Sequence, residues 1–156
     1  MEISASLPED RLSILDVARS TGVFTAEEIA TVDELFAGYL RDPQASGYNF
    51  LSCREGDEVL GFACWGPTAL SKGAADLYWI CTAQRAQRRG VAAALFRAVE
   101  EAVANLGRWL IVIWTSSREA YAPARNFYLR MGCVLQTQIA DFYDRGEDLC
   151  IFVRRL

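Results

Sequence analysis

The sequence LYWICT at residues 77–82, followed by QRRGVA at residues 87–92, spans a junction between an apolar strand and a long amphipathic helix. Peptide N–H groups and arginine side chains therefore meet where the helix begins. The first N–H groups of a helix have no partner within it and lie at the positive end of its dipole. Gly90 lets a ligand approach the main chain closely. The junction is typical of a site that binds an anion such as a phosphate group.

The chain after the junction completes a strand–helix–strand unit over residues 77–115. Apolar residues between Val91 and Leu106 recur with a period of about 3.6, and Gly107 is typical of a helix end. Residues 109–115 carry no charge, which indicates a strand buried on both faces. Because a helix leads to this strand, we expect it to pair in parallel with the strand before the helix.

Shorter patterns on both sides of this unit predict the remaining elements. Apolar residues at helical spacing indicate two helices near the N-terminus, and Thr25 with Glu28 forms a capping-box pattern at the start of the second. Pro123 suits the first turn of a later helix and Gly132 its end. These elements are a short strand at residues 1–4, helices at 8–20, 25–40 and 125–131, a hairpin with strands at 48–54 and 59–66, and strands at 133–140 and 149–154 joined by an acidic connection at 141–148.

Length and composition limit the class of protein. The 156-residue length and 52% hydrophobic content fit one domain over residues 1–156 with its own core. The net charge of -4 argues against a general nucleic-acid-binding protein, which would need a basic face. No apolar run is long enough to cross a membrane, and no secretory signal pattern is present. We therefore expect a cytoplasmic location and no membrane partner.

Cysteine and histidine usage limits the chemistry. The five cysteines stand singly, mostly in apolar runs, and are interpreted as reduced core thiols. Histidine is absent, which removes the commonest metal ligand and the commonest general base. No metal site is expected. Acid–base chemistry then has to use carboxylates, tyrosines, a thiol, Lys72 or water.

Two motifs give the chain a resemblance to a known family. Residues 87–92 match the pattern Gln/Arg-x-x-Gly-x-Gly/Ala after a strand, and NFYLRMG at residues 126–132 matches a helix of the type Asn-Phe-Tyr-x-x-x-Gly. Either motif alone is weak, but together, in this order and on either side of a predicted strand, they are specific. In these motifs and in the order of its elements, most of the chain resembles the GNAT superfamily of acyl-CoA-dependent N-acyltransferases.

The resemblance implies an α/β (α+β) fold. Its central sheet would be mixed and mostly antiparallel, with one parallel strand–helix–strand unit and helices on both faces. It also implies an N-acetyltransferase that transfers an acetyl group from acetyl-CoA directly to a primary amine. A small-molecule amine is favoured because the chain has no obvious appended segment for recognising a protein. A homodimer is compatible with the sequence, although no particular residue indicates one.

The same resemblance assigns the donor site to the strand-to-helix junction. Its peptide N–H groups, with the charges of Arg88 and Arg89, would hold the diphosphate of coenzyme A. The pantetheine arm would bond to the main chain at the end of the preceding strand. Asn126 would bond the donor arm or, with equal weight, is a surface residue of its helix. The predicted donor-binding residues are Ile80, Cys81, Thr82, Gln87, Arg88, Arg89, Gly90, Val91, Ala92 and Asn126.

Two residues are predicted to be catalytic. By motif position Tyr128 resembles the tyrosine that protonates the leaving thiolate, and a phenol with an ordinary pKa of about 10 can donate at neutral pH. The alternative is that Tyr128 only packs in the core. Asp76 would share a strand face with Tyr78 and Ile80 and relay a proton from the ammonium through water, or it faces solvent, which is slightly favoured. Cys81 is disfavoured as a nucleophile because no histidine can activate it.

The acceptor site and the rival functions stay open. The acidic connection, with Phe142 and Tyr143, is either a surface for a cationic amine or a hydrated hairpin loop. Glu27, Glu28 and Tyr121 are weaker candidates for the pocket. The alternative to an enzyme is a catalytically inactive acyl-CoA-binding sensor or partner protein, and a third alternative is an interaction module without a ligand.

Overall fold

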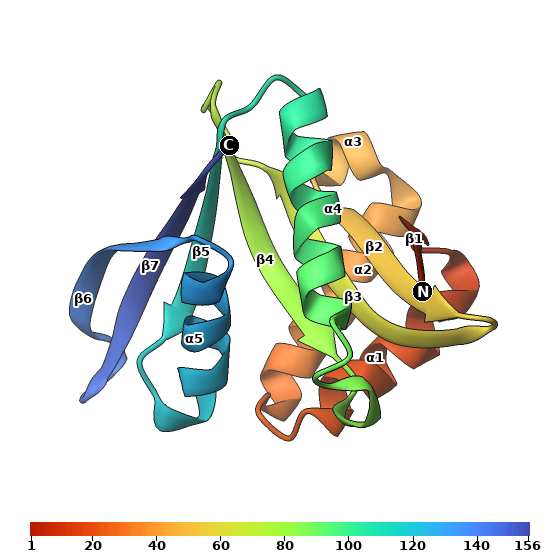
Figure 1. Ribbon diagram of the computed structural model, residues 1–156, viewed down its shortest axis with the longest axis horizontal. Helices are drawn as coiled ribbons and strands as arrows, with labels where there is room; N and C mark the ends of the chain where they lie inside the picture. The colour runs from red at the N-terminus through yellow and green to blue at the C-terminus, as the bar shows by residue number, and fades with distance from the viewer.

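A computed structural model describes residues 1–156 as one seven-stranded mixed sheet with helices on both faces (Figure 1). The strand order is β1-β2-β3-β4-β5-β7-β6, and only β4 and β5 run parallel, which confirms the predicted sheet. The elements are β1 (Glu2–Ala5), η1 (Pro8–Asp10), α1 (Arg11–Ser20), α2 (Ala26–Arg41), α3 (Pro43–Ser46), β2 (Asn49–Glu55), β3 (Glu58–Pro67), β4 (Ala74–Thr82), η2 (Gln84–Ala86), α4 (Val91–Asn105), β5 (Leu110–Ser116), η3 (Glu119–Tyr121), α5 (Ala122–Arg130), β6 (Val134–Asp144) and β7 (Glu147–Arg155). None of these helices combines the length and apolar character needed to cross a bilayer.

Two helix starts show how local sequence determines the elements. At α2 the Glu28 N–H donates to the Thr25 hydroxyl at 3.2 Å, and the Thr25 N–H donates to the Glu28 carboxylate at 2.7 Å, which confirms the capping box. The short helix α3 was not predicted. It forms because the Asp42 carboxylate accepts the N–H groups of Gln44 and Ala45, each at 3.0 Å.

The core lies on both faces of β3. On one face, which α1 and α2 cover, the rings of Phe50 and Phe62 stack with centroids 6.2 Å apart, and Phe36 of α2 packs edge-on against Phe50 at 5.0 Å. On the other face α4 packs closely because Gly61 has no side chain. A Cβ at Gly61 would lie 2.8 Å from the Val91 side chain. The start of α4 is thereby held close to the sheet.

The C-terminal hairpin corrects one prediction. The acidic connection expected at residues 141–148 is mostly strand, because β6 runs to Asp144 and β7 begins at Glu147. The Asp141 carboxylate accepts the Gly146 N–H at 2.6 Å, and the Asp148 carboxylate accepts the Asp141 N–H at 3.0 Å. These carboxylates therefore stabilise the exposed end of the hairpin.

Candidate active site

A cleft opens where the two parallel strands separate. β4 and β5 pair only from Ala74 with Leu110 to Leu77 with Ile113. Beyond these pairs the strands diverge (Figure 1), and a cleft of about 1230 Å³ lies between the two parts of the sheet. The main chain at the end of β4 therefore has a strand partner, β3, on one edge only. The free edge can accept an extended ligand as an additional strand.

A β-bulge at Tyr78 lies beside the opening. Trp65 of β3 pairs with Leu77, and the preceding residue Cys64 pairs with Trp79, so Tyr78 has no partner in β3. A bulge bends the strand that carries it and interrupts the alternation of side chains. The expected shared face of Asp76, Tyr78 and Ile80 is therefore wrong, because it assumed regular alternation through this segment.

The junction before α4 presents a row of free peptide N–H groups. The first hydrogen bond of α4 runs from the Ala94 N–H to the Gly90 carbonyl at 3.0 Å, and the N–H groups of residues 88–93 have no acceptor in the protein. Arg88 and Gly90 both adopt left-handed backbone conformations, with φ of 62° and 84°. Such a turn can aim successive N–H groups toward one point, as anion-binding loops do.

The structure separates the arginines that the sequence groups together. Arg88 lines the cleft and has no ion-pair partner. Arg89 instead pairs with Glu55 at 2.7 Å, a contact that raises the pKa of the arginine and lowers that of the carboxyl group. Arg85 likewise pairs with Glu58. Of the two arginines expected near the phosphates, Arg88 alone lines the cleft.

Most of the remaining predicted donor-binding residues also line the cleft. They are Ile80, Cys81, Thr82, Gln87, Gly90, Val91 and Ala92. The Thr82 hydroxyl is buried and has no hydrogen-bond partner, so one polar group of this wall is left unsatisfied within the protein. Asn126 is exposed on α5 and does not line the cleft. These free polar groups suit the amides and phosphates of a coenzyme A molecule.

Tyr128 combines the two roles considered for it. Its ring is buried, only 7% exposed, and packs against Phe127 and Phe152 with centroids 5.6 and 5.7 Å away. The residue also lines the cleft, and its hydroxyl makes no hydrogen bond within the protein. Burial raises the pKa of the Tyr128 phenol above its ordinary value, so the group stays protonated at neutral pH. The side chain is a packed residue that can still donate a proton into the cleft.

Asp76 lies at the narrow end of the cleft, in the last paired part of β4. The Thr68 hydroxyl donates to its carboxylate at 2.7 Å, and the residue is half-buried. Next to it, burial and then the Asp76 charge raise the pKa of Tyr78 to about 12. Asp76 forms no ion pair. Its carboxylate is free to interact with a cation or a water molecule in the cleft.

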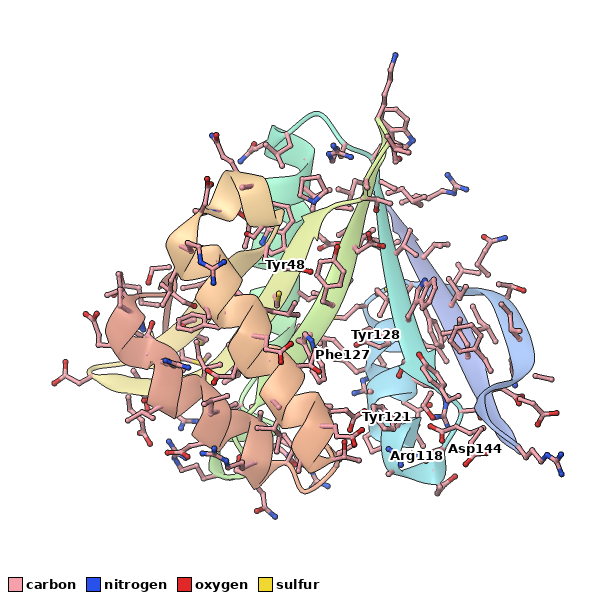
Figure 2. All side chains as sticks on the ribbon, turned by 180° about the vertical axis from the view of Figure 1, so that it is seen from behind. Tyr48, Arg118, Tyr121, Phe127, Tyr128 and Asp144 are labelled. Atoms are coloured by element: carbon pink, nitrogen blue, oxygen red, sulfur yellow. The ribbon has the colours of Figure 1, made fainter.

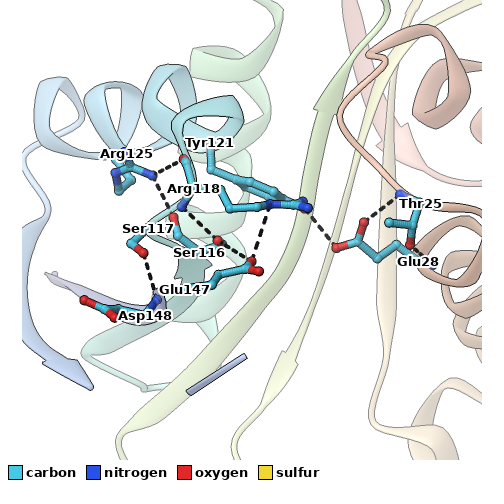
Figure 3. A network of polar contacts seen from close by, with 9 residues as sticks. All are labelled: Thr25, Glu28, Ser116, Ser117, Arg118, Tyr121, Arg125, Glu147 and Asp148. Carbon is cyan, nitrogen blue, oxygen red and sulfur yellow. Dashed lines mark hydrogen bonds and ion pairs between the residues drawn. The ribbon is translucent and has the colours of Figure 1, made fainter. Parts of the chain in front are cut away.

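Glu28 and Tyr121 meet across the mouth of the cleft (Figure 3). The Tyr121 hydroxyl donates to Glu28 Oε1 at 2.9 Å, while Oε2 of the same carboxylate caps α2. Burial and this hydrogen bond raise the pKa of the Tyr121 phenol. The Arg118 guanidinium lies 5.2 Å from the Tyr121 ring centroid and pairs with Glu147 at 3.4 Å. The predicted weaker candidates Glu28 and Tyr121 thus line the cleft, whereas Glu27 does not.

Aromatic side chains that the sequence did not single out complete this part of the cleft. Tyr48 lies on the side of β2 to β4, and Tyr121 and Phe127 lie on the side of α5 (Figure 2). The rings of Phe24 and Trp79 meet edge to face at 5.0 Å. Tyr143 and Glu147, from the acidic connection considered above as a surface for a cationic amine, also line the cleft, and the aromatic lining residues that no local pattern indicated include Phe24, Tyr48, Trp79 and Trp114. They come from segments far apart in the sequence, so only their positions in the fold could reveal them.

The charges that line the cleft are segregated. Arg88 lies in the turn before α4, among the free N–H groups, and Arg130 is the last residue of α5. The acidic residues Glu28, Asp76 and Glu147 come from α2, β4 and β7. No cluster of three or more acidic or cysteine side chains is placed to hold a metal ion. One half of the cleft is suited to an anionic donor and the other to a cationic acceptor.

A mixed sheet that opens between its parallel strands, beside an N–H-rich helix start, defines the class of acyl-CoA-dependent N-acyltransferases. The sequence matches the model of the acetyltransferase (GNAT) family over residues 13–133. The chain belongs to this family and is an acetyltransferase.

Solved structures with the same fold include members that act on different amines. A protein from Desulfovibrio desulfuricans, described as an acetyltransferase of the GNAT family, is 37% identical with a TM-score of 0.94, over 99% of this chain and 98% of that one. An aminoglycoside 6'-N-acetyltransferase complexed with coenzyme A is 15% identical, with a TM-score of 0.79 over 99% and 97%. The ribosomal-protein-S18-alanine N-acetyltransferase from Escherichia coli is 18% identical, with a TM-score of 0.77 over 99% and 92%. A search of curated proteins found no match.

Proposed function

We propose that this acetyltransferase uses acetyl-CoA as its donor and acetylates a primary amine of a small molecule. The observation that carries the proposal is the row of free N–H groups at residues 88–93, which opens into the cleft beside the free edge of β4. The diphosphate would accept hydrogen bonds from these groups, with Arg88 adding positive charge. The pantetheine arm would bond to the main chain of residues 80–82 as an added strand.

The residues of the cleft support direct transfer. The amine nitrogen attacks the thioester carbon, so a C–N bond forms and the C–S bond breaks. Tyr128 gives its proton to the departing thiolate and regains one from solvent. The proton lost by the amine passes to water, with Asp76 as the nearest carboxylate on β4 to assist. Holding both substrates in one cleft supplies the proximity that the reaction needs.

A covalent route through Cys81 is disfavoured. Cys81 is only 3% exposed, and burial raises the pKa of its thiol well above the ordinary value. The reactive form of cysteine is the thiolate, which such burial opposes. The absence of histidine also removes the usual activating base. All five cysteines are unpaired, which suits a reducing cytoplasmic compartment.

The test is an amine-library acetylation assay read by product mass and by release of free coenzyme A. The proposal expects turnover on at least one small amine and thermal stabilisation by coenzyme A. A ligand at a hundredfold its dissociation constant adds about 2.7 kcal/mol to the free energy of unfolding, which a melting experiment detects. Stabilisation without turnover on any amine would favour the acyl-CoA-binding sensor. No stabilisation at all would contradict the donor assignment.

A further inference from the structure

We infer that Glu28 selects a diamine acceptor, of which one nitrogen is acetylated while the other, as an ammonium ion, pairs with the Glu28 carboxylate. The inference rests on the proposed function and names the substrate class of the same cleft. It concerns the acceptor half alone, so its test can fail while the donor assignment stands.

Glu28 is held in place from both sides of the cleft (Figure 3). Its Oε2 accepts the Thr25 N–H at 2.7 Å, and its Oε1 accepts the Tyr121 hydroxyl at 2.9 Å. A carboxylate oxygen has lone pairs for more than one donor, so both contacts leave room for an additional cationic donor. The side chain is thus pre-positioned, and a ligand does not have to order it.

The charged side chains near the cleft leave the Glu28 carboxylate without an ion-pair partner. No arginine, lysine or N-terminus forms an ion pair with Glu28. The Arg118 guanidinium lies beside the Tyr121 ring, 5.2 Å from its centroid, and is paired with Glu147 at 3.4 Å. A half-buried carboxylate without a countercharge attracts a cation from the ligand.

Aromatic rings connect Glu28 with the end of β4. The Phe24 ring lies 6.3 Å from the Tyr121 ring and 5.0 Å from the Trp79 ring, measured between centroids. Trp79 directly follows the bulge of β4, where the free edge begins. An aliphatic chain between two nitrogens would lie along these rings, and their faces favour an ammonium group over a neutral end.

The helix α5 sets the length of the acceptor. Tyr121 ends η3 and is the N-cap of α5, seven residues before Tyr128, so the two residues lie about 10 Å apart along the axis of α5. In the proposed function the reacting thioester lies beside Tyr128, and the Tyr121 hydroxyl contacts Glu28. A diamine must therefore carry several methylene groups between its nitrogens to occupy both positions.

The test compares the wild-type chain with Glu28→Gln and Glu27→Gln. Acceptors are a series of α,ω-diaminoalkanes and the n-alkylamines of the same chain lengths, and the measurement is kcat/KM from coenzyme A release. In Glu28→Gln the amide oxygen can still accept the Thr25 N–H and keep the capping box, while the amide NH2 can donate to the Tyr121 hydroxyl, which then acts as the acceptor, so the variant removes the charge and keeps both contacts. Glu27→Gln makes the same charge change on an exposed side chain outside the cleft, and its melting temperature and selectivity provide the matched control.

The inference expects the wild type to prefer the diamines by about tenfold once the chain is long enough, mainly through a lower KM. Glu28→Gln should lose this preference and Glu27→Gln should retain it. A preference for the alkylamines, an equal use of both series, or a preference that survives in Glu28→Gln would overturn the inference while leaving the acetyltransferase intact. Absence of stabilisation by coenzyme A would instead overturn the proposed function.

Discussion

The donor half of the cleft and the acceptor half are built in different ways. The donor half offers main-chain groups, namely the free N–H groups of residues 88–93 and the unpaired edge of β4. The acceptor half offers side chains, among them Glu28 and Tyr121 in contact at 2.9 Å although 93 residues separate them in the sequence. Main-chain recognition tolerates many side chains, whereas acceptor recognition depends on each one. The proposed donor site thus depends on the fold, and the proposed acceptor site depends on particular side chains.

Tyr128→Phe should have the greatest effect, because Tyr128 is the proposed proton donor of the reaction that joins the two halves. Removing the proton donor is expected to lower kcat about a hundredfold or more, with little change in the KM for acetyl-CoA. Since burial raises the pKa of the phenol, Tyr128 stays in its acid form to pH values above its ordinary pKa of about 10. The kcat of Tyr128→Phe should therefore be lower than that of the wild type by the same factor at every pH between neutral and mildly alkaline, so the two pH profiles keep the same shape. A variant with wild-type kcat would restrict Tyr128 to packing.

Gly90→Glu tests whether the donor half depends on its main chain. A carboxylate at this left-handed position would repel the diphosphate, and the dissociation constant for coenzyme A should rise about a hundredfold, or roughly 2.7 kcal/mol. Gly107→Glu is the matched control, because Gly107 has a φ of 71°, also has open space around its Cβ position, and lies at the other end of α4. Calorimetry should show that both variants lower the melting temperature equally. Only Gly90→Glu should lose affinity for coenzyme A. Equal affinities would refute the donor assignment.

Asp76→Asn tests the acceptor half at its narrow end. Asparagine can still accept the Thr68 hydroxyl, so the change removes the charge and the proton acceptor while keeping the contact. We expect kcat/KM for the amine to fall about tenfold, with an unchanged dissociation constant for coenzyme A. A loss of coenzyme A binding with unchanged amine kinetics would place Asp76 in the donor half instead.

Cys81→Ala should have the smallest effect. The donor arm would bond to the main chain at this position, and the thiol is buried and protonated, so kcat should stay within about twofold of the wild type. Free energy of unfolding should decrease by roughly 1 kcal/mol because a small buried group is removed. Abolished turnover with intact coenzyme A binding would revive a covalent intermediate.

Local sequence patterns predicted most elements of the fold and much of the donor half. The strand–helix–strand unit at residues 77–115, the hairpin of β2 and β3, and the capping box at Thr25 are confirmed because each depends on residues close together in the chain. The free N–H groups follow from the helix start itself, so the motif at residues 87–92 sufficed to indicate them.

Predictions that depended on register or on distant partners failed or stayed weak. The bulge at Tyr78 arises from the pairing of β4 with β3, and the sequence of β4 alone does not predict it. Arg88 and Arg89 could not be distinguished in the sequence, because the ion pair of Arg89 with Glu55 forms only in the folded chain. The aromatic side chains of the acceptor half line one cleft only because the connection between α1 and α2, β4, β5 and α5 converge there. Long-range packing of this kind carries no local sequence signal.

The proposed donor site depends on main-chain recognition of coenzyme A, which amide NMR can observe residue by residue. The ¹⁵N-labelled protein would be titrated in parallel with coenzyme A and with pantetheine, which lacks the diphosphate. We predict that coenzyme A shifts the amide resonances of residues 88–93 strongly, that pantetheine leaves them in place, and that both ligands shift those of residues 80–82. Unshifted resonances at residues 88–93 with saturating coenzyme A, or equal shifts with pantetheine, would contradict the account.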